Sequence, residues 1–368
     1  MKVLILSCYT GEGHNSAAYA VKEALELKGI FCELADPVLF KSKRAQKFVS
    51  SFYNGMIKNA PSTFGVLYKA GALYDSTGIT SPVYLANATY SENLYNYIIS
   101  NSYDAVISSH LYGMESLTAI KRKTNCSIPF YGILTDYTII PFLAETKLDG
   151  YFIPHVELKQ GLIKKGIPDN LIFSSGIPVS AKFRNHMPRS ESRTYLNIPL
   201  DKKMILVMSG GVVGGNLVKL CNELINRTDD NHIIYALTGR NETMRKEIDE
   251  RYGASSRIIT VPFTKEVNIY MNCADVLLSK PGGLSSTEAA VSNVPLIHVN
   301  AIPGCETENA KFFADHGMSL NAKNINEAAE YAITLTSDEQ KSERMRERQR
   351  LTINPHAADY IAEKVIEI

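Results

Sequence analysis

Short apolar runs rich in β-branched residues alternate with helical patterns along most of this 368-residue chain. The runs in the first half are "KVLILSC", "IFCELAD", "YDAVISSH", "PFYGILTD", "DGYFIP" and "NLIFSS". Those in the second half are "KMILVMSGG", "HIIYALTG", "RIITVPF", "ADVLLSK" and "PLIHVN". This rhythm is typical of parallel strands joined by right-handed helical crossovers. The sequence therefore predicts an α/β protein with doubly wound sheets.

The rhythm restarts near residue 200, after a stretch rich in proline, polar and charged residues. A chain of this length is also too long for one ordinary domain. We predict a first domain over 1–180, a linker over 181–199, a second domain over 200–345, and a C-terminal helix within 346–368 that packs back on the first domain. Two such sheets facing each other would form a cleft at the C-terminal ends of their strands.

Bulk composition excludes several classes of protein. A net charge of +1 argues against a nucleic-acid binder. Six scattered cysteines without a CxxC pair suggest reduced thiols in a cytosolic protein. The opening "MKVLILSCYTGEGH" is predicted to be a strand rather than a signal peptide, and no run approaches the roughly 20 apolar residues of a spanning helix. We expect a protein that is soluble or lies on a membrane without crossing it.

Residues 41–100 break the rhythm, because they contain helical patterns and no clear strand. Aromatic and aliphatic residues are interleaved there with basic ones, and Asp75 lies among them as an opposing acid. The basic residues are Lys41, Lys43, Arg44, Lys47, Lys58 and Lys69. An amphipathic basic segment can lie in a bilayer interface and attract anionic lipids. A pair of ordinary core helices with a solvated face is the alternative.

The motif "TGEGHNSAA" joins the first strand to a helix predicted over 16–28. Gly11 and Gly13 allow a tight turn and close backbone approach. The helix N-terminus beyond Asn15 favours an anion or polar ligand. His14 would face the cleft, where imidazole is the usual side chain for proton transfer near neutral pH.

Two other interpretations of this motif stay open. Gly11 and Gly13 also match the first two glycines of a dinucleotide fingerprint, with Asp36 placed to bind a ribose. Ser16 replaces the third glycine of that fingerprint. His14 could also be a structural loop residue.

Two later strand-to-helix turns suit a phosphorylated ligand. In "MSGGVVGGN", the amides of Gly210 and Gly211 could wrap a diphosphate, or the stretch is a plain glycine turn. In "SKPGGLSSTEA", Lys280 could bring charge to a phosphate and Glu288 could accept from a ribose diol. The alternative there is a capping box closed by Glu288. The candidate contacts in this second turn are Lys280, Gly282, Gly283, Leu284, Ser285, Ser286 and Glu288.

The loop "NAIPGCETENAKFF" follows one strand later, and its Glu306 and Asn309 could bind sugar hydroxyls. Acids at a helix start are also often merely favoured by the helix dipole. In "ILTDYTIIPF", Asp136 ends a strand and either orients or accepts a proton, or forms a turn. His110 is similarly placed, and His155 is expected to cap a helix. The histidines show no metal-ligand spacing.

Taken in order, these motifs resemble those of monogalactosyldiacylglycerol synthases and bacterial processive diacylglycerol glucosyltransferases, which belong to glycosyltransferase family 28. The resemblance implies a GT-B fold, with two Rossmann-like doubly wound domains facing a central cleft and a C-terminal helix that crosses back. It also implies membrane association without spanning, a UDP-sugar substrate, no cofactor or active-site metal, and inversion at the anomeric carbon.

The resemblance assigns roles to individual residues. It implies that Glu288 binds the ribose and that His14 lies on the acceptor side. It also implies that the segment 41–100 contacts lipid. The diphosphate loop corresponds to Lys280, Gly282 and Gly283, and the sugar-contacting loop to Glu306 and Asn309. Cys305 stands where the family often has glutamine, which leaves the identity of the hexose open.

The reaction expected from this resemblance moves a hexose from UDP-glucose or UDP-galactose to diacylglycerol or a related lipid, with His14 or Asp136 as the base. The enzyme would be cytoplasmic and peripherally bound to the inner face of the cell membrane, with anionic lipids as partners. An epimerase-like enzyme, a non-catalytic nucleotide-sugar sensor and a dinucleotide oxidoreductase are the alternatives.

Overall fold

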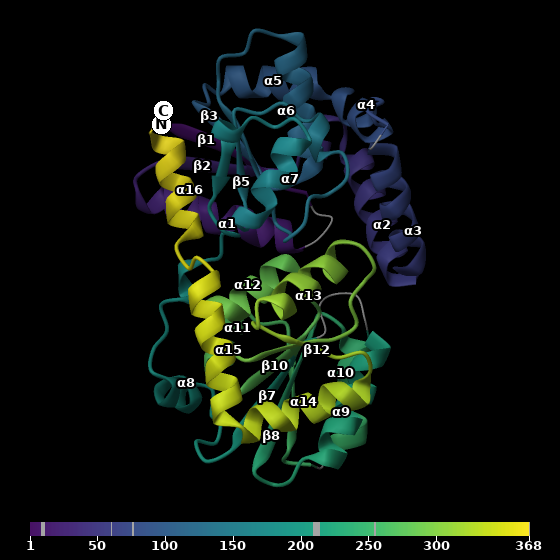
Figure 1. Cartoon of the computed structure of the whole chain (residues 1–368), viewed down its shortest axis with the longest axis vertical. Helices are drawn as coiled ribbons and strands as arrows, with labels where there is room; N and C mark the ends of the chain where they lie inside the picture. Colours follow the sequence, from purple (N-terminus) through teal and green to yellow (C-terminus); the bar gives the residue numbers. More distant parts are fainter. Residues whose placement is uncertain (9–11, 60, 76, 209–213, 254, 368) are drawn as a thin grey trace. The chain divides into compact units, whose positions relative to one another are not determined.

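The computed structural model describes the chain except for residues 9–11, 60, 76, 209–213, 254 and 368. It divides into two compact units, shown in Figure 1. The first comprises 1–181, 303–305 and 354–368, and the second comprises 182–302 and 306–353. Each unit is built on a six-stranded parallel sheet, which confirms the predicted α/β class.

The sheet of the first unit has the strand order β2-β1-β3-β4-β5-β6. The chain places β2 on one side of β1 and then returns to place β3 on the other side. The order therefore reverses between β1 and β3, which is where ligands usually bind in sheets of this kind. The strands are β1 (Lys2–Leu6), β2 (Phe31–Ala35), β3 (Ala105–Ser108), β4 (Phe130–Ile133), β5 (Gly150–Ile153) and β6 (Ile172–Ser174).

Two hydrophobic cores cover the faces of this sheet, because successive side chains of a strand point to opposite faces. Val3 and Ile5 pack with helices α1 (Glu12–Leu27) and α16 (Ala357–Ile366). Leu4 and Leu6 join the other core, which contains residues of α5 (Ser91–Ser100), α6 (Leu111–Lys123) and α7 (Lys159–Lys164). Figure 1 shows α16, the last helix of the chain, beside α1.

The predicted helical insertion is confirmed. After the 3-10 turn η1 (Pro37–Phe40) come α2 (Lys43–Asn59), α3 (Pro61–Asp75), α4 (Pro82–Ala88) and then α5. No strand lies among the described residues between β2 and β3. No helix in the described part of the chain combines the length and the apolar character needed to cross a bilayer.

The second unit is also doubly wound, but its strand order, β12-β11-β10-β7-β8-β9, differs from that of the first unit. Its order reverses between β7 and β10. The strands are β7 (Lys203–Met208), β8 (His232–Gly239), β9 (Ile258–Pro262), β10 (Val276–Ser279), β11 (Leu296–His298) and β12 (Leu320–Asn321). The helices are α9 (Gly214–Arg227), α10 (Glu242–Tyr252), α11 (Val267–Cys273), α12 (Gly283–Val291), α13 (Cys305–Asp315), α14 (Ile325–Ser337) and α15 (Glu339–Thr352).

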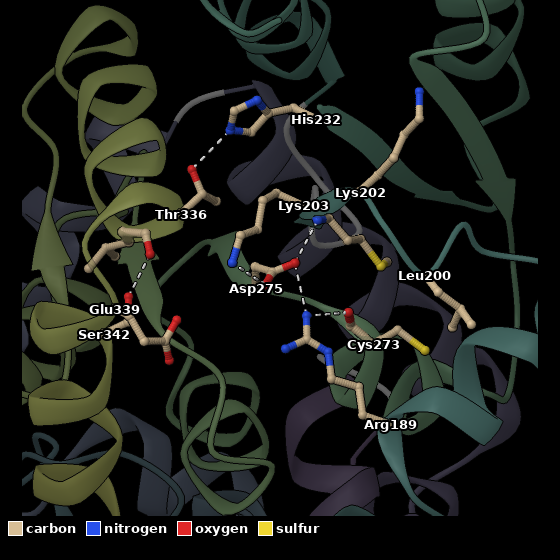
Figure 2. A network of polar contacts seen from close by, with 12 residues as sticks. Arg189, Leu200, Lys202, Lys203, His232, Cys273, Asp275, Thr336, Glu339 and Ser342 are labelled. Carbon is tan, nitrogen blue, oxygen red and sulfur yellow. Dashed lines mark hydrogen bonds and ion pairs between the residues drawn. The ribbon is translucent and has the colours of Figure 1, made fainter. Parts of the chain in front are cut away.

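The stretch expected to be a linker contains helix α8 (Arg189–Tyr195), which is anchored on the second unit. The buried Arg193 donates to the carbonyls of Cys273 and Lys202 and to Asp275 Oδ2 at 2.9 Å. Figure 2 shows Arg189 and Lys203 also reaching Asp275. Burial alone would raise the pKa of Asp275, but Arg189, the Met204 N–H and Arg193 outweigh it and hold that pKa below its usual value.

Candidate functional site

The ends of β1, β3 and β4 meet around His14, in the first turn of α1. Its Nδ1 lies 2.9 Å from the Ser109 carbonyl oxygen and 2.9 Å from Thr135 Oγ1. A carbonyl oxygen only accepts, so Nδ1 carries the proton and Nε2 is left with its lone pair. Ser109 Oγ in turn donates to the His14 carbonyl oxygen at 3.0 Å. The imidazole is thus fixed in the tautomer that suits a proton acceptor.

Electrostatics keep this imidazole neutral. Burial lowers the pKa of His14, and the nearby Asp136 carboxylate opposes that shift. The His110 ring packs edge-on against His14, with centroids 4.6 Å apart, and burial also lowers the pKa of His110. His110 Nδ1 accepts the Tyr112 backbone N–H at 3.2 Å, so His110 caps α6.

A cavity of about 20 Å³ lies beside His14, enough for roughly one water molecule. The polar part of its lining includes His14, Asp136 and Thr138, and the apolar part includes Met114 and Ile140. The structure therefore brings together the two residues that the sequence offered as candidate bases. The close approach of α6 to the sheet depends on Gly113, because a Cβ there would meet Ser108 Oγ at 2.3 Å.

The predicted acceptor loop is partly wrong. Helix α1 begins at Glu12 rather than near residue 16, so Gly13 and Asn15 lie in its first turn. Asn15 is buried and accepts from Ser7 Oγ at 2.6 Å, so it braces β1 instead of facing a ligand. Gly11 lies outside the described residues.

The structure argues against the dinucleotide interpretation, because the acidic residue that it needs is engaged elsewhere. Asp36 is buried and uses Oδ1 to accept the Val38 N–H at 2.9 Å, which caps the turn η1. Its Oδ2 accepts from Gln46 at 2.9 Å. A carboxylate engaged in this way is not presented to a ribose. His155 caps the short turn that follows β5, as predicted.

In the second unit, the loop between β10 and α12 lies at the sheet's reversal point. The N-cap of α12 is Gly282, so the alternative interpretation of this turn, a capping box begun by Ser285 or Ser286, is wrong. Ser286 points inward, because its Oγ is hydrogen-bonded to the buried His298 Nε2 at 2.9 Å. Burial lowers the pKa of His298 to about 3, so this ring is neutral. Gly283, Leu284 and Ser285 form the first turn of α12.

This loop is joined to the loop that follows β11. Lys280 Nζ lies 3.3 Å from Glu306 Oε1, and Glu306 Oε2 accepts the Ile302 N–H at 2.8 Å. The buried Asn309 amide donates to the Pro281 carbonyl oxygen at 3.1 Å. The structure thus places the predicted diphosphate and sugar loops side by side. Gly210 and Gly211, predicted to contact the diphosphate, lie outside the described residues.

Glu288 lies one and a half turns into α12, and its side chain is half-buried. Burial raises its pKa to about 8, while Lys182 acts in the opposite direction. No described side chain donates a hydrogen bond to this carboxyl group. Glu288 is therefore an available acceptor at the edge of the loop.

Sequence reasoning missed the residues that orient His14. Ser109 and Thr135 come directly before His110 and Asp136, at the ends of β3 and β4. Hydroxyl residues at the ends of central strands were the available signal. Lys182, the cation that faces Glu288, carried no such signal, because it stands in a stretch expected to be a linker.

Comparison with protein families gives two matches that together cover most of the chain. Residues 14–179 match the family model for monogalactosyldiacylglycerol (MGDG) synthase, and residues 191–352 match the model for glycosyl transferases group 1. A processive diacylglycerol β-glucosyltransferase of Bacillus cytotoxicus is 25% identical, over 100% of this chain and 93% of its own length. The enzyme of the same name from Bacillus pumilus is 24% identical, over 100% and 94%.

Solved structures give the same fold. MurG of Acinetobacter baumannii has a TM-score of 0.65 at 16% identity, with both chains fully covered. UDP-GlcNAc 2-epimerase of Neisseria meningitidis, bound to UDP-GlcNAc, has a TM-score of 0.63 at 15% identity, again with full coverage. These likenesses establish a GT-B-like architecture and do not separate transferases from epimerases. Together with the sequence matches, they show that this chain is a glycosyltransferase of the MGDG synthase and processive diacylglycerol glucosyltransferase family.

Proposed function

We propose that this protein moves a hexose from a UDP-sugar to diacylglycerol and so makes a glycolipid. The full-length relatives are named for transfer to diacylglycerol, and the MGDG synthase model matches the first unit. The observation that carries the proposal is the His14 site, where a half-buried imidazole has its Nδ1 proton held by a carbonyl oxygen. Such a group can take the proton of an attacking hydroxyl.

The proposed reaction is a single displacement with inversion. The acceptor hydroxyl oxygen bonds to the anomeric carbon, while the bond from that carbon to the UDP oxygen breaks. His14 Nε2 takes the hydroxyl proton, and UDP leaves with the electron pair. The Asp136 charge stabilises the imidazolium that forms, because it favours the protonated form of His14. Asp136 therefore supports His14, which is the better candidate for the base.

The second unit would hold the donor. The α12 N-terminus and Lys280 supply positive charge for the diphosphate, and Glu288 accepts from the ribose hydroxyls. Glu306 and Asn309 stand at the adjacent loop, where the hexose would follow. A diphosphate on Lys280 would compete with Glu306 and turn that carboxylate toward the sugar. Preorganised donors of this kind stabilise the charge on the leaving UDP.

Helix α2 supports a peripheral membrane position, on the cytoplasmic face. Phe48 and Phe52 are 69% and 60% exposed, and their rings stack with centroids 6.2 Å apart. Lys43, Arg44 and Lys47 are exposed on the same helix. Exposed aromatic rings beside basic residues are typical of helices that bind anionic lipid surfaces.

The test is transfer itself. The purified protein is incubated with vesicles containing diacylglycerol and anionic lipid, and with radiolabelled UDP-glucose or UDP-galactose in separate reactions. We expect label in the organic phase with at least one donor, and at least about 100-fold slower labelling with His14→Ala. Conversion of the donor to its epimer, or release of free sugar without labelled lipid, would contradict the proposal.

A further inference from the structure

Glu115, in the middle of α6, is an acidic residue that the proposed mechanism does not use. Its side chain is fully buried, and neither carboxyl oxygen receives a hydrogen bond from the described residues. Buried polar groups nearly always have a partner, and an unpaired buried charge is strongly unfavourable. The state of this carboxyl group therefore needs an explanation.

The side chain facing Glu115 is another carboxyl group, that of Glu145 in the 3-10 turn η2 (Leu143–Glu145). Both Glu145 oxygens are acceptors already, one from the Ser81 N–H at 3.0 Å and one from Ser81 Oγ. Two carboxylates have no hydrogen to share, but one carboxylic acid can donate to the other group. Burial, together with Glu145, raises the pKa of Glu115 to about 9.

The other charged and titratable groups around Glu115 are engaged elsewhere. Arg122 of α6 donates to the Glu145 carbonyl oxygen at 2.8 Å and lies over the Tyr84 ring of α4. Asp75 of α3 is paired at 2.6 Å with Lys165, the residue that follows α7. The Tyr151 hydroxyl of β5 is 2.9 Å from Thr146 Oγ1. The attraction of Arg122 is thus weaker than burial and the Glu145 charge combined.

The turn next to Glu145 is strained. Phe142 has φ 66°, a left-handed conformation that bulky residues rarely adopt. Its N–H donates to Asp75 Oδ1 at 3.1 Å, and its ring contacts Tyr74 with centroids 6.2 Å apart. Such strain persists only where the surroundings hold the backbone in place. Asp75 and Glu145 are two of the groups that do so.

This turn ends the loop that begins at Asp136. Thr138 and Ile140 of the loop line the cavity beside His14, as does Met114, the residue before Glu115. The Asp75 and Glu145 side chains therefore hold the far end of the acceptor-side loop against the junction of α3 and α4. Any movement of that end would displace the cavity lining.

We propose that Glu115 and Glu145 share one proton, and that they act as positioning residues for the 136–145 loop and the Ser81 cap of α4. Loss of the proton would put two like charges together, one on the fully buried Glu115 and one on the half-buried Glu145. Glu145 would then move away, release Ser81, and loosen the loop on the acceptor side. That part of the proposal rests on the proposed function, whereas the shared proton does not.

Glu115→Gln is the informative variant, because a carboxamide keeps the shape and can donate to Glu145 without ionising. Infrared spectra of the folded wild type at about pH 7 should show the band of a protonated carboxylic acid that this variant lacks, in addition to the Glu288 band that both proteins share. Absence of that band in the wild type would overturn the shared proton. Glu115→Ala is a poor test, since a cavity alone could unfold the protein.

Thermal unfolding gives a second test that is independent of activity. An unfolded Glu titrates near pH 4.3, so between about pH 5 and 9 the folded wild type holds one more proton than the unfolded chain. The stabilisation from this extra proton is complete below the pKa of Glu in the unfolded chain. It is lost as pH rises through the pKa of Glu115 in the folded protein. As pH rises over that range, we expect the Tm of Glu115→Gln to increase relative to the Tm of the wild type. A difference in Tm that stays constant with pH would contradict the proposal.

Kinetics test the positioning role. Between about pH 7 and 9.5 the acceptor KM of the wild type should rise roughly five-fold or more relative to Glu115→Gln, while kcat at saturating acceptor differs little. Ser81→Ala should show a raised acceptor KM at both pH values, because its cap is absent throughout. If the infrared and Tm results hold but the acceptor KM does not move, the shared proton is structural and the positioning role is wrong. If no transfer occurs at all, the proposed function fails while the first two tests still stand.

Discussion

The two units are both doubly wound, yet the reversal points of their sheets carry different chemistry. The first presents a neutral imidazole, fixed by the Ser109 carbonyl oxygen and surrounded by buried side chains. The second presents the Lys280–Glu306 ion pair and the positive end of α12. A neutral base suits proton removal from an alcohol, and fixed positive charge suits a diphosphate. The fold thus provides two equivalent places, and side chains decide which substrate each one serves.

Removing the base should give the largest effect and the clearest separation of the two sites. His14→Ala is expected to lower kcat by about 10²- to 10⁴-fold, the usual contribution of a general base. UDP affinity, measured by calorimetry, should be unchanged, since donor binding is assigned to the other unit. If His14→Ala lowered UDP affinity as strongly as kcat, the division of base and donor binding between the two units would be wrong.

Removing the lysine should give the opposite pattern. Lys280→Gln is expected to weaken UDP binding by roughly 10- to 100-fold, as for loss of a charge-assisted hydrogen bond. Uridine affinity serves as the control, because uridine has no diphosphate and should bind equally to both proteins. A variant that loses uridine and UDP affinity to the same degree would point to misfolding of the loop.

The raised pKa of Glu288 predicts a pH effect confined to the donor side. If the ribose hydroxyls donate to its carboxylate, UDP binding favours the ionised form and strengthens as pH rises toward about 8. The gain should reach about ten-fold between pH 6.5 and 8 relative to Glu288→Gln. Dividing the UDP affinity of the wild type by that of Glu288→Gln at each pH cancels the titration of UDP itself. A ratio that does not change with pH would show that Glu288 does not contact the ribose.

The smallest expected effect is that of Glu306→Gln, which should strengthen binding of UDP but weaken binding of the UDP-sugar. Glu306→Gln removes the charge that faces Lys280, so UDP should bind about two- to five-fold more tightly at low salt. The KM for the UDP-sugar should nevertheless rise, because a sugar contact is lost. Tighter binding of both ligands would mean that Glu306 only restrains Lys280 and does not meet the hexose.

The sequence predicted the architecture and the positions of the site loops, because periodicity and strand ends are local signals. It did not predict side-chain direction within the first turns of helices. Asn15 and Ser286 were assigned to ligands, yet Ser7 and His298 hold them inside. These partners are set by packing, which no local pattern records.

Other features depend on partners far apart in the chain. The Glu115–Glu145 pair and the Asp75–Phe142 contact join segments that only the fold brings together. The cap of α12 was missed for a different reason, since glycine and serine compete for that role and the close packing around Ser286 decides it.

The packing of α16 against α1 has a consequence for biosynthesis. The ribosome makes the helix that carries His14 before the second unit, and its packing partner α16 only after nearly all of that unit. Until then, Val3, Ile5 and their neighbours lack part of their apolar cover. The second unit, which awaits only its own residues up to Ile353, can therefore mature first, contrary to the usual N-terminal-first order. The nascent chain should acquire affinity for nucleotide before it acquires the capacity for turnover.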